Sequence, residues 1–287
     1  MRKDLYRYLG LLMLLLLLLG SVYGQPPASG PYRLDLKREL VLGSVSAGAA
    51  AAGYFLNHAD DPIPYRSLSL PGVPSFDRTA LGRDSESAVT TSDVVAYGTL
   101  AAPLLLLTDR RVANDAFTLG VLFAETMLLN QGVTDIIKAA VRRPRPYLYA
   151  ANLPADMPVT AYDRSSYLSN HTSTTAAAAF FAGRVFADYH PESKLKPYVW
   201  VASAALPAVA GYLRVRGGQH FPSDVVAGYG LGAAIGYGIP LLHRTARVDS
   251  RLSVVPIGSG LLLTYDFARG GATAAPAALQ EFTWEPN

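Results

Sequence analysis

The sequence predicts an all-α protein, a bundle of six helices that is associated with a membrane. Half of the 287 residues are hydrophobic and only 16% are charged, whereas about a quarter are charged in ordinary soluble domains. Apolar runs of helical length recur along the chain and are separated by segments rich in proline and glycine. No segment before residue 250 keeps the alternation of apolar and polar residues that is typical of a strand.

The N-terminus has the organisation of an export signal. Arg2, Lys3 and Arg7 precede the apolar run Tyr8–Gly20, and small residues follow at the positions that a signal peptidase reads. The run is shorter than the roughly 20 residues of a membrane-spanning helix, so residues 1–24 are predicted to be a cleaved signal peptide. An uncleaved signal anchor is the alternative. Either would export the rest of the chain, as a membrane-associated protein facing the periplasm or as a soluble periplasmic one.

Six segments carry the apolar runs expected of the bundle helices. They are Leu40–Asn57, Val94–Thr108, Val112–Val141, Thr172–Tyr189, Tyr198–Leu213 and Val225–Leu242. These segments are rich in alanine and glycine, which permits close helix packing. Glu125 and Arg184 lie inside the third and fourth segments, and a helix that faced lipid there would not tolerate these charges cheaply.

The domain plan follows from these segments. Residues 25–88 are predicted to be an N-terminal helix and a loop that is rich in proline and glycine over Ser67–Asp84. Residues 59–88 are a candidate gate for the substrate. Residues 89–243 are expected to be the core that carries the site. In the tail, residues 244–287, two apolar stretches flank Gly258-Ser259-Gly260, which predicts a short hairpin.

Three short pieces of the chain carry the residues that predict its chemistry. Lys138 and Arg145 lie at the end of the third helix, Ser169, Asn170 and His171 lie at the start of the fourth, and Arg214, His220 and Asp224 lie between the fifth and the sixth. Because antiparallel helices joined by short connections return to the same end of a bundle, we expect the pieces to meet. Lysine and arginine at this density converge on an anion, most often a phosphate. Free N–H groups at the helix starts attract the same ligand.

Two histidines beside a bound phosphate predict phosphoryl transfer. Asp224 is placed to accept a hydrogen bond from one ring nitrogen of His220 and leave the other free to attack, and His171 is placed to protonate the leaving oxygen. The chain has no cysteine, which excludes a thiol nucleophile and a thiolate metal site. Three cations in one site repel a divalent ion, so neither a metal nor another cofactor is expected there. A metal hydrolase is the alternative, and it would lose its activity to a chelator.

The same three pieces resemble a family signature. They read KAAVRRPRP, LSNH and LRVRGGQHFPSD, and the signature of the type 2 phosphatidic acid phosphatase superfamily is Lys-x6-Arg-Pro, Pro-Ser-Gly-His and Ser-Arg-x5-His-x3-Asp. That superfamily also contains bacterial acid phosphatases and vanadium haloperoxidases. The resemblance covers roughly residues 90 to 243. It implies a helix bundle of that superfamily's type, and vanadate as an inhibitor or phosphate mimic.

The resemblance also implies roles for the residues that match. Lys138, Arg145 and Arg214 would hold the phosphate, with help from Ser169 and Asn170. His220 would form a phosphohistidine, Asp224 would orient it, and His171 would be the general acid.

The chain departs from the signature at three positions. Leu168 replaces a proline, Asn170 a glycine and Leu213 a serine. Asparagine tolerates a left-handed backbone better than other residues, so the anion-binding amide at Asn170 is expected to survive. Leu213 removes a hydroxyl group expected near the phosphate. These departures bear on substrate preference and rate rather than on the type of reaction.

Other charged residues are expected to be structural. His58, His190 and His243 each follow a helix end, where the helix dipole favours a histidine. Arg142, Arg143 and Arg216 lie near helix ends and are expected to be solvated charges that add at most to the anion field.

The sequence thus predicts a phosphatase that hydrolyses phosphomonoesters or diphosphates without a metal and prefers a lipid phosphate. Three alternatives stay open: a soluble, non-specific periplasmic acid phosphatase, a vanadium-dependent haloperoxidase, and an inactive exported protein that binds phosphate or has a structural role. The formal net charge is only +3, and the first seven residues supply two of these charges. No basic field remains for binding nucleic acid.

Overall fold

The computed structural model describes residues 30–58, 62–151, 153–245, 252–257 and 260–265. The chain divides into two compact units, residues 1–245 and residues 246–287. The signal peptide predicted over residues 1–24 lies outside the described residues.

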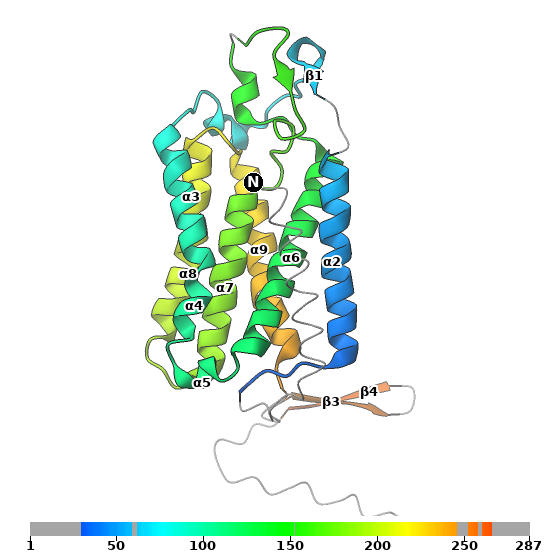
Figure 1. Cartoon of the computed structure of the whole chain (residues 1–287), viewed down its shortest axis with the longest axis vertical. Coiled ribbons are helices and arrows are strands. Elements are labelled where there is room, and N and C mark those ends of the chain that lie inside the picture. Colours follow the sequence, from blue (N-terminus) through cyan, green and yellow to red (C-terminus); the bar gives the residue numbers. More distant parts are fainter. Residues whose placement is uncertain (1–29, 59–61, 152, 246–251, 258–259, 266–287) are drawn as a thin grey trace, which may run out of the picture. The chain divides into compact units, whose positions relative to one another are not determined.

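The main unit is a bundle of long helices, as the composition predicts (Figure 1). The helices are α2 (Leu36–His58), α3 (Glu86–Leu100), α4 (Ala102–Leu106), α5 (Arg110–Ala113), α6 (Ala116–Val141), α7 (Asn170–Tyr189), α8 (Lys196–Arg216) and α9 (Pro222–His243). The connections contain the 3-10 turns η1 (Tyr65–Ser67), η2 (Ser75–Ala80) and η3 (Pro146–Tyr149), and the short antiparallel strands β1 (Ile63–Pro64) and β2 (Pro158–Val159). Helix α7 is central and packs against α3, α6, α8 and α9, while α2 packs on α6.

Glycines bring α9 into backbone contact with α7. Gly228, Gly232 and Gly236 are buried and recur at every fourth residue of α9. A Cβ atom at Gly232 would lie 2.0 Å from the carbonyl oxygen of Ser173, and one at Gly236 would lie 2.2 Å from that of Ala177. Because any side chain would push the helices apart, this spacing of small residues fixes their approach. It also fixes how the start of α9 meets the start of α7.

Two predicted helices have different boundaries in the structure. The second was expected from Val94 but begins at Glu86, because Ser85 caps it by accepting a hydrogen bond from the amide of Ala88 at 3.3 Å. It ends at Leu100 and α4 follows, since Pro103 lacks the N–H that would continue the ladder. The third was expected from Val112, but that residue belongs to the separate turn α5.

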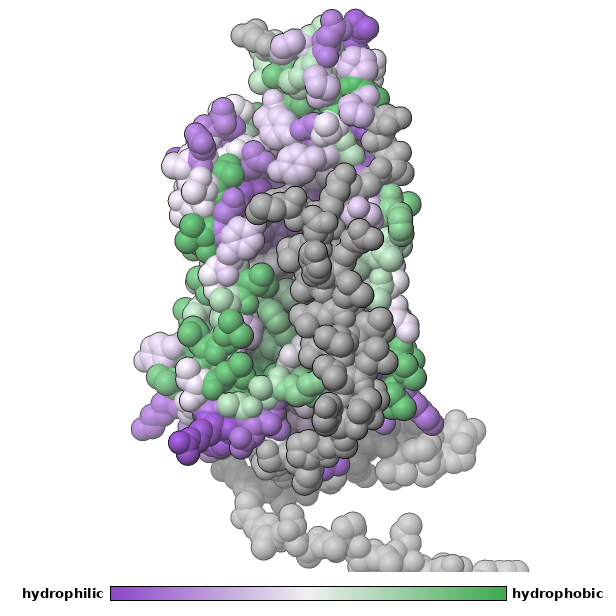
Figure 2. All heavy atoms as spheres, viewed as in Figure 1, coloured by the Kyte–Doolittle hydropathy of each residue, from purple (hydrophilic) through white to green (hydrophobic). Residues whose placement is uncertain are grey.

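Five segments of the described chain are long and apolar enough to cross a membrane. They are Leu36–Asn57, Glu86–Leu106, Ala116–Tyr149, Lys196–Arg216 and Pro222–His243. Large apolar side chains such as Leu40, Leu105 and Val226 point outward from them. Outside the grey atoms of Figure 2, hydrophobic side chains gather mainly over the lower half of the helices, and hydrophilic ones lie at both ends of the bundle. Glu125 and Arg184 are only 0% and 8% exposed, so both charges lie inside the bundle rather than against lipid.

The second unit contains the hairpin that the tail predicts. Strand β3 (Leu252–Ile257) pairs in antiparallel register with β4 (Gly260–Tyr265). The second strand thus begins at Gly260, one residue earlier than the apolar pattern indicates.

Candidate active site

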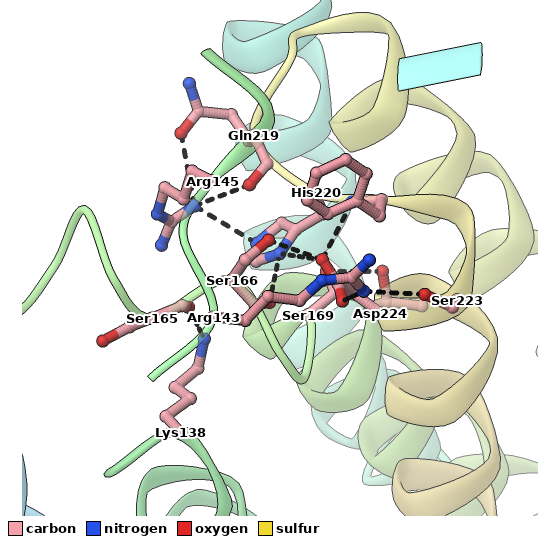
Figure 3. A network of polar contacts seen from close by, with 12 residues as sticks. Lys138, Arg143, Arg145, Ser165, Ser166, Ser169, Gln219, His220, Ser223 and Asp224 are labelled. Atoms are coloured by element: carbon pink, nitrogen blue, oxygen red, sulfur yellow. Dashed lines mark hydrogen bonds and ion pairs between the residues drawn. The ribbon is translucent and has the colours of Figure 1, made fainter. Parts of the chain in front are cut away.

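The three predicted pieces meet at one end of the main unit, where α6 and α8 end and α7 and α9 begin (Figure 3). Helix α6 stops because Arg142 adopts a left-handed conformation, with φ of 49°, and Pro144 follows. The amide of Ser169 donates to the carbonyl of Asp224 at 3.0 Å, which joins the starts of α7 and α9.

His220 is held in one tautomer just before α9. Its side chain is 1% exposed, and Nδ1 lies 2.7 Å from the carbonyl oxygen of Ser166, so Nδ1 carries the proton and donates it. Nε2 keeps its lone pair and lies 3.5 Å from Nη1 of Arg145. Burial, followed by the positive charges of Arg145 and Lys138, lowers the pKa of His220 well below 6.5. The ring is therefore neutral and nucleophilic near neutral pH.

Asp224 does not make the hydrogen bond to His220 that the sequence suggests. Its Oδ2 atom lies 3.8 Å from Nδ1 of His220 and instead accepts from the hydroxyl of Ser166 at 2.5 Å and from the amide of Phe221 at 2.8 Å. Oδ1 pairs with Arg143 at 2.5 Å. Asp224 is the third residue of α9, and its bond to the Phe221 amide is half of a capping box. The carboxylate thus fixes the backbone on which His220 sits, and Ser166 holds the ring.

The three predicted cations are buried at the same end of the bundle. Lys138 Nζ donates to the carbonyl of Ser165 at 2.6 Å. Arg145 donates from Nε to the carbonyl of Tyr162 and from Nη1 to that of Gln219, both at 2.9 Å. These side chains are 6% and 3% exposed and are held by neutral carbonyl groups, so their charge remains available to an anion.

Asp93 of α3 contacts two of the predicted site residues, His171 and Arg214. The sequence did not predict a part for Asp93 in the site. Its Oδ1 atom lies 2.8 Å from Nε2 of His171 and 3.2 Å from Nη1 of Arg214. Asp93 is the more exposed partner, with 40% of its side chain accessible against 13% for His171 and 4% for Arg214. A sequence signal existed, because Asp93 ends a polar run that directly precedes an apolar helix run.

Comparison with known proteins finds a family for the part of the chain that carries these residues. A family model described as the PAP2 superfamily matches residues 119–247, a range that contains every predicted catalytic and phosphate-binding residue. Residues 119–247 of the chain thus belong to the PAP2 superfamily.

Individual PAP2 relatives match more loosely. Decaprenylphosphoryl-5-phosphoribose phosphatases from two strains of Mycobacterium tuberculosis are 36% identical over 104 residues, which cover 36% of this chain and 50% of theirs. The chain thus spans about half the length of the curated relatives it matches. A solved transmembrane PAP2-type phosphatidylglycerolphosphate phosphatase from Bacillus subtilis is similar at 17% identity and a TM-score of 0.35, over 83% of this chain and 94% of that one.

Arg143 has a larger part in this PAP2 site than a solvated charge would have. Besides Asp224, it contacts Asp77 at 2.7 Å and the hydroxyl of Ser223 at 2.8 Å, and it lies 4.0 Å above the ring of Phe221. Asp77 is 2% exposed and also accepts from the amide of Ser223 at 2.9 Å. The loop expected to gate the substrate is therefore anchored beside the site through η2.

The two small polar residues at the start of α7 differ in part from expectation. Ser169 is fully buried, and its hydroxyl lies 2.9 Å from that of Thr172. Asn170 does not need the tolerance of a left-handed backbone that asparagine offers, since it is the first residue of α7 and its φ is not positive. Its side-chain Oδ1 is buried without a hydrogen-bond partner among the described residues. The amides of this helix start still face the end where the cations gather.

Both carboxylates of the PAP2 site already have protein partners: Asp224 is engaged by Arg143, Ser166 and a backbone amide, and Asp93 by His171 and Arg214. Within the described part of the chain, the group of side chains spaced to hold a metal is Glu39, Glu125 and His243.

Proposed function

We propose that this protein is a metal-independent phosphatase of lipid phosphates that works through a phosphohistidine on His220. The observation that carries the proposal is the state of the His220 ring. Its Nδ1 donates a hydrogen bond to the carbonyl oxygen of Ser166, and its Nε2 is unprotonated and faces Arg145 among buried cations. A neutral imidazole beside a cationic anion site is what an in-line attack on phosphorus needs.

The reaction then proceeds in two balanced steps. Nε2 of His220 forms a bond to phosphorus while the bond from phosphorus to the ester oxygen breaks, and His171 gives that oxygen a proton. A water molecule next attacks the phosphohistidine, loses its proton to His171 and releases inorganic phosphate. Lys138, Arg145 and Arg214 neutralise the charge on the phosphoryl oxygens in both steps.

Asp93 and Asp224 are positioning residues in this mechanism. The same oxygen of Asp93, Oδ1, contacts the imidazole of His171 and the guanidinium of Arg214, so the acid and one phosphate ligand keep a fixed separation. When a phosphate arrives, it competes with Asp93 for Arg214. Asp224 holds the turn before α9 through the amide of Phe221.

A lipid is the preferred substrate class because of where the site lies. It lies at the ends of four candidate membrane spans whose outward side chains are apolar, so the phosphate of a lipid anchored in the bilayer would lie near it. The curated relatives are named for a decaprenylphosphoryl substrate, which is also a lipid phosphate. We therefore propose an integral membrane protein whose active end faces the periplasm.

The test is phosphate release by the purified full-length protein in detergent micelles. The panel contains phosphatidate, a polyprenyl phosphate, a polyprenyl diphosphate and a soluble sugar phosphate, each with and without a strong chelator. Faster release from the lipids, unchanged by the chelator, is expected. Preference for the sugar phosphate would remove the lipid assignment, and bromide oxidation with vanadate and peroxide but no phosphatase activity would identify a haloperoxidase.

A further inference from the structure

A second buried cluster of ionisable groups lies at the other end of the bundle. Glu39 is in the first turn of α2, Glu125 is within α6 and His243 is the last residue of α9. Helix α9 starts beside the phosphatase site and ends at this cluster (Figure 1). The three residues are 4%, 0% and 0% exposed, and one ligand atom from each lies within 4.8 Å of the others.

His243 is oriented as a metal-binding histidine is. Its Nδ1 lies 2.8 Å from the carbonyl oxygen of Ile239, one helical turn earlier, and donates its proton there. Nε2 therefore points into the cluster, at 2.9 Å from Oε2 of Glu39 and 3.3 Å from Oε2 of Glu125. A backbone carbonyl on one ring nitrogen is the usual device that aims the other nitrogen at a metal.

Glu125 supplies an independent sign that a ligand belongs here. Neither of its carboxylate oxygens has a hydrogen-bond partner among the described residues, although the side chain is fully buried. Glu39 differs, because its Oε1 accepts from the amide of Asp35 at 3.0 Å and from Nε of Arg38 at 3.2 Å, which leaves Oε2 for the cluster. Two buried carboxylates this close need a cation or a proton between them.

We propose that Glu39, Glu125 and His243 bind one divalent metal ion of the zinc type, in a structural site that ties α2 to α6 and α9. Metal bonds of about 2.0–2.1 Å place tetrahedral ligand atoms about 3.3 Å apart, and the two spacings to His243 are 2.9 and 3.3 Å. Two carboxylates and a neutral imidazole compensate a divalent charge, so the filled site is neutral and can be buried. An imidazole ligand favours zinc over magnesium or calcium.

The competing account is a proton shared by the two glutamates beside a charged His243. The chain offers a matched control, because His190 is built in the same way at the end of α7. Its Nδ1 lies 3.1 Å from the carbonyl of Phe186, and its Nε2 lies 2.8 Å from Oδ2 of Asp109. His190 thus faces one carboxylate where His243 faces two.

The experiment uses full-length protein in detergent, stripped with a chelator and titrated with zinc chloride. Bound zinc is measured by mass spectrometry after desalting, and Tm is measured on the same samples. One zinc per chain and a Tm rise of about 5 °C or more at saturation are expected. His190→Asn should keep both, whereas His243→Asn and Glu125→Gln should lose both.

The wild-type titration alone can overturn the proposal, even if a variant fails to fold. Wild-type protein that retains no zinc after desalting, or that retains the same amount as His243→Asn, excludes the site. Glu125→Gln that matches the Tm of wild type under every zinc concentration would establish the shared proton instead.

Discussion

The two ends of α9 carry the same residue type in opposite electrostatic surroundings. His220, two residues before the helix, lies among Arg145, Lys138 and Arg214, while His243, its last residue, faces Glu39 and Glu125. Both rings donate from Nδ1 to a backbone carbonyl and aim Nε2 inward. The difference therefore lies in the charges that meet Nε2: cations make a place for an anion, and carboxylates make a place for a cation.

The helix itself favours this division. The start of a helix carries partial positive charge and attracts anions, and its end carries partial negative charge and attracts cations. The charged side chains at each end of α9 have the same sign as the helix dipole there: cations surround His220, and carboxylates surround His243. If the comparison is correct, changes at the first end should affect turnover, and matched changes elsewhere should not.

The largest effect is expected for His220→Ala. Loss of the nucleophile should lower kcat by about 10⁴-fold or more, because the variant lacks the neutral Nε2 that lies 3.5 Å from Nη1 of Arg145. Phosphate release from the best lipid substrate is the measurement, with His190→Ala as a control that keeps wild-type activity. Normal turnover by His220→Ala would refute the mechanism.

His171→Ala should lower kcat by about 10²–10⁴-fold with an alkyl phosphate ester, because the leaving oxygen loses its proton donor. An aryl ester such as 4-nitrophenyl phosphate needs little protonation and should be affected far less. Kinetics with the two esters measure the difference. Equal losses with both would assign His171 to binding instead of acid catalysis.

Arg214→Lys should lower kcat by about 10²–10³-fold, since a lysine cannot reproduce the forked contact with a phosphoryl group. Arg216→Lys is the matched control on the same helix, because Arg216 is exposed and its Nη1 donates to the hydroxyl of Tyr212 at 3.2 Å, away from Asp93 and His171. Steady-state kinetics of both variants provide the check. Similar losses in the two would mean that general charge, rather than the position of Arg214, matters.

Asp93→Asn should lower kcat by about ten- to hundred-fold, because His171 and Arg214 lose the carboxylate that holds them together. If Asp93 had only a structural role, its replacement would lower kcat by the same factor whether or not His171 is present. The loss should instead shrink in a His171→Ala background, and a double-mutant cycle measures this coupling. Full additivity would exclude the positioning role.

The smallest expected signature is the position of the acid limb of kcat/KM. The pKa of His220 lies below 6.5 because of burial and then the adjacent cations. The nucleophile is therefore neutral at pH 6.5 and is lost only as pH falls below that value. A pH profile of kcat/KM reports the free enzyme, and an acid limb at or above pH 6.5 would contradict a buried, neutral His220.

Much of the site was predictable because its residues lie close together in the chain. Lys138 and Arg145 share one helix end, and His220 and Asp224 are separated by a single turn, so local rules fix their placement. The partners of these residues were not predictable in the same way. Ser166 takes the ring nitrogen assigned to Asp224, and Arg143 proved to be partly buried and paired with Asp77 rather than solvated.

The sequence by itself determined the helices, the order of the charged pieces and the end of the bundle at which they meet, since apolar periodicity and helix stops are local properties. Only the tertiary structure decided what each charge touches. Asp93 reaches His171 from a helix that precedes it by 78 positions, and Glu39 reaches His243 across 204 positions. Such pairs depend on helix rotation and approach, which are set by contacts such as Gly232 against Ser173 and have no signature in either segment alone.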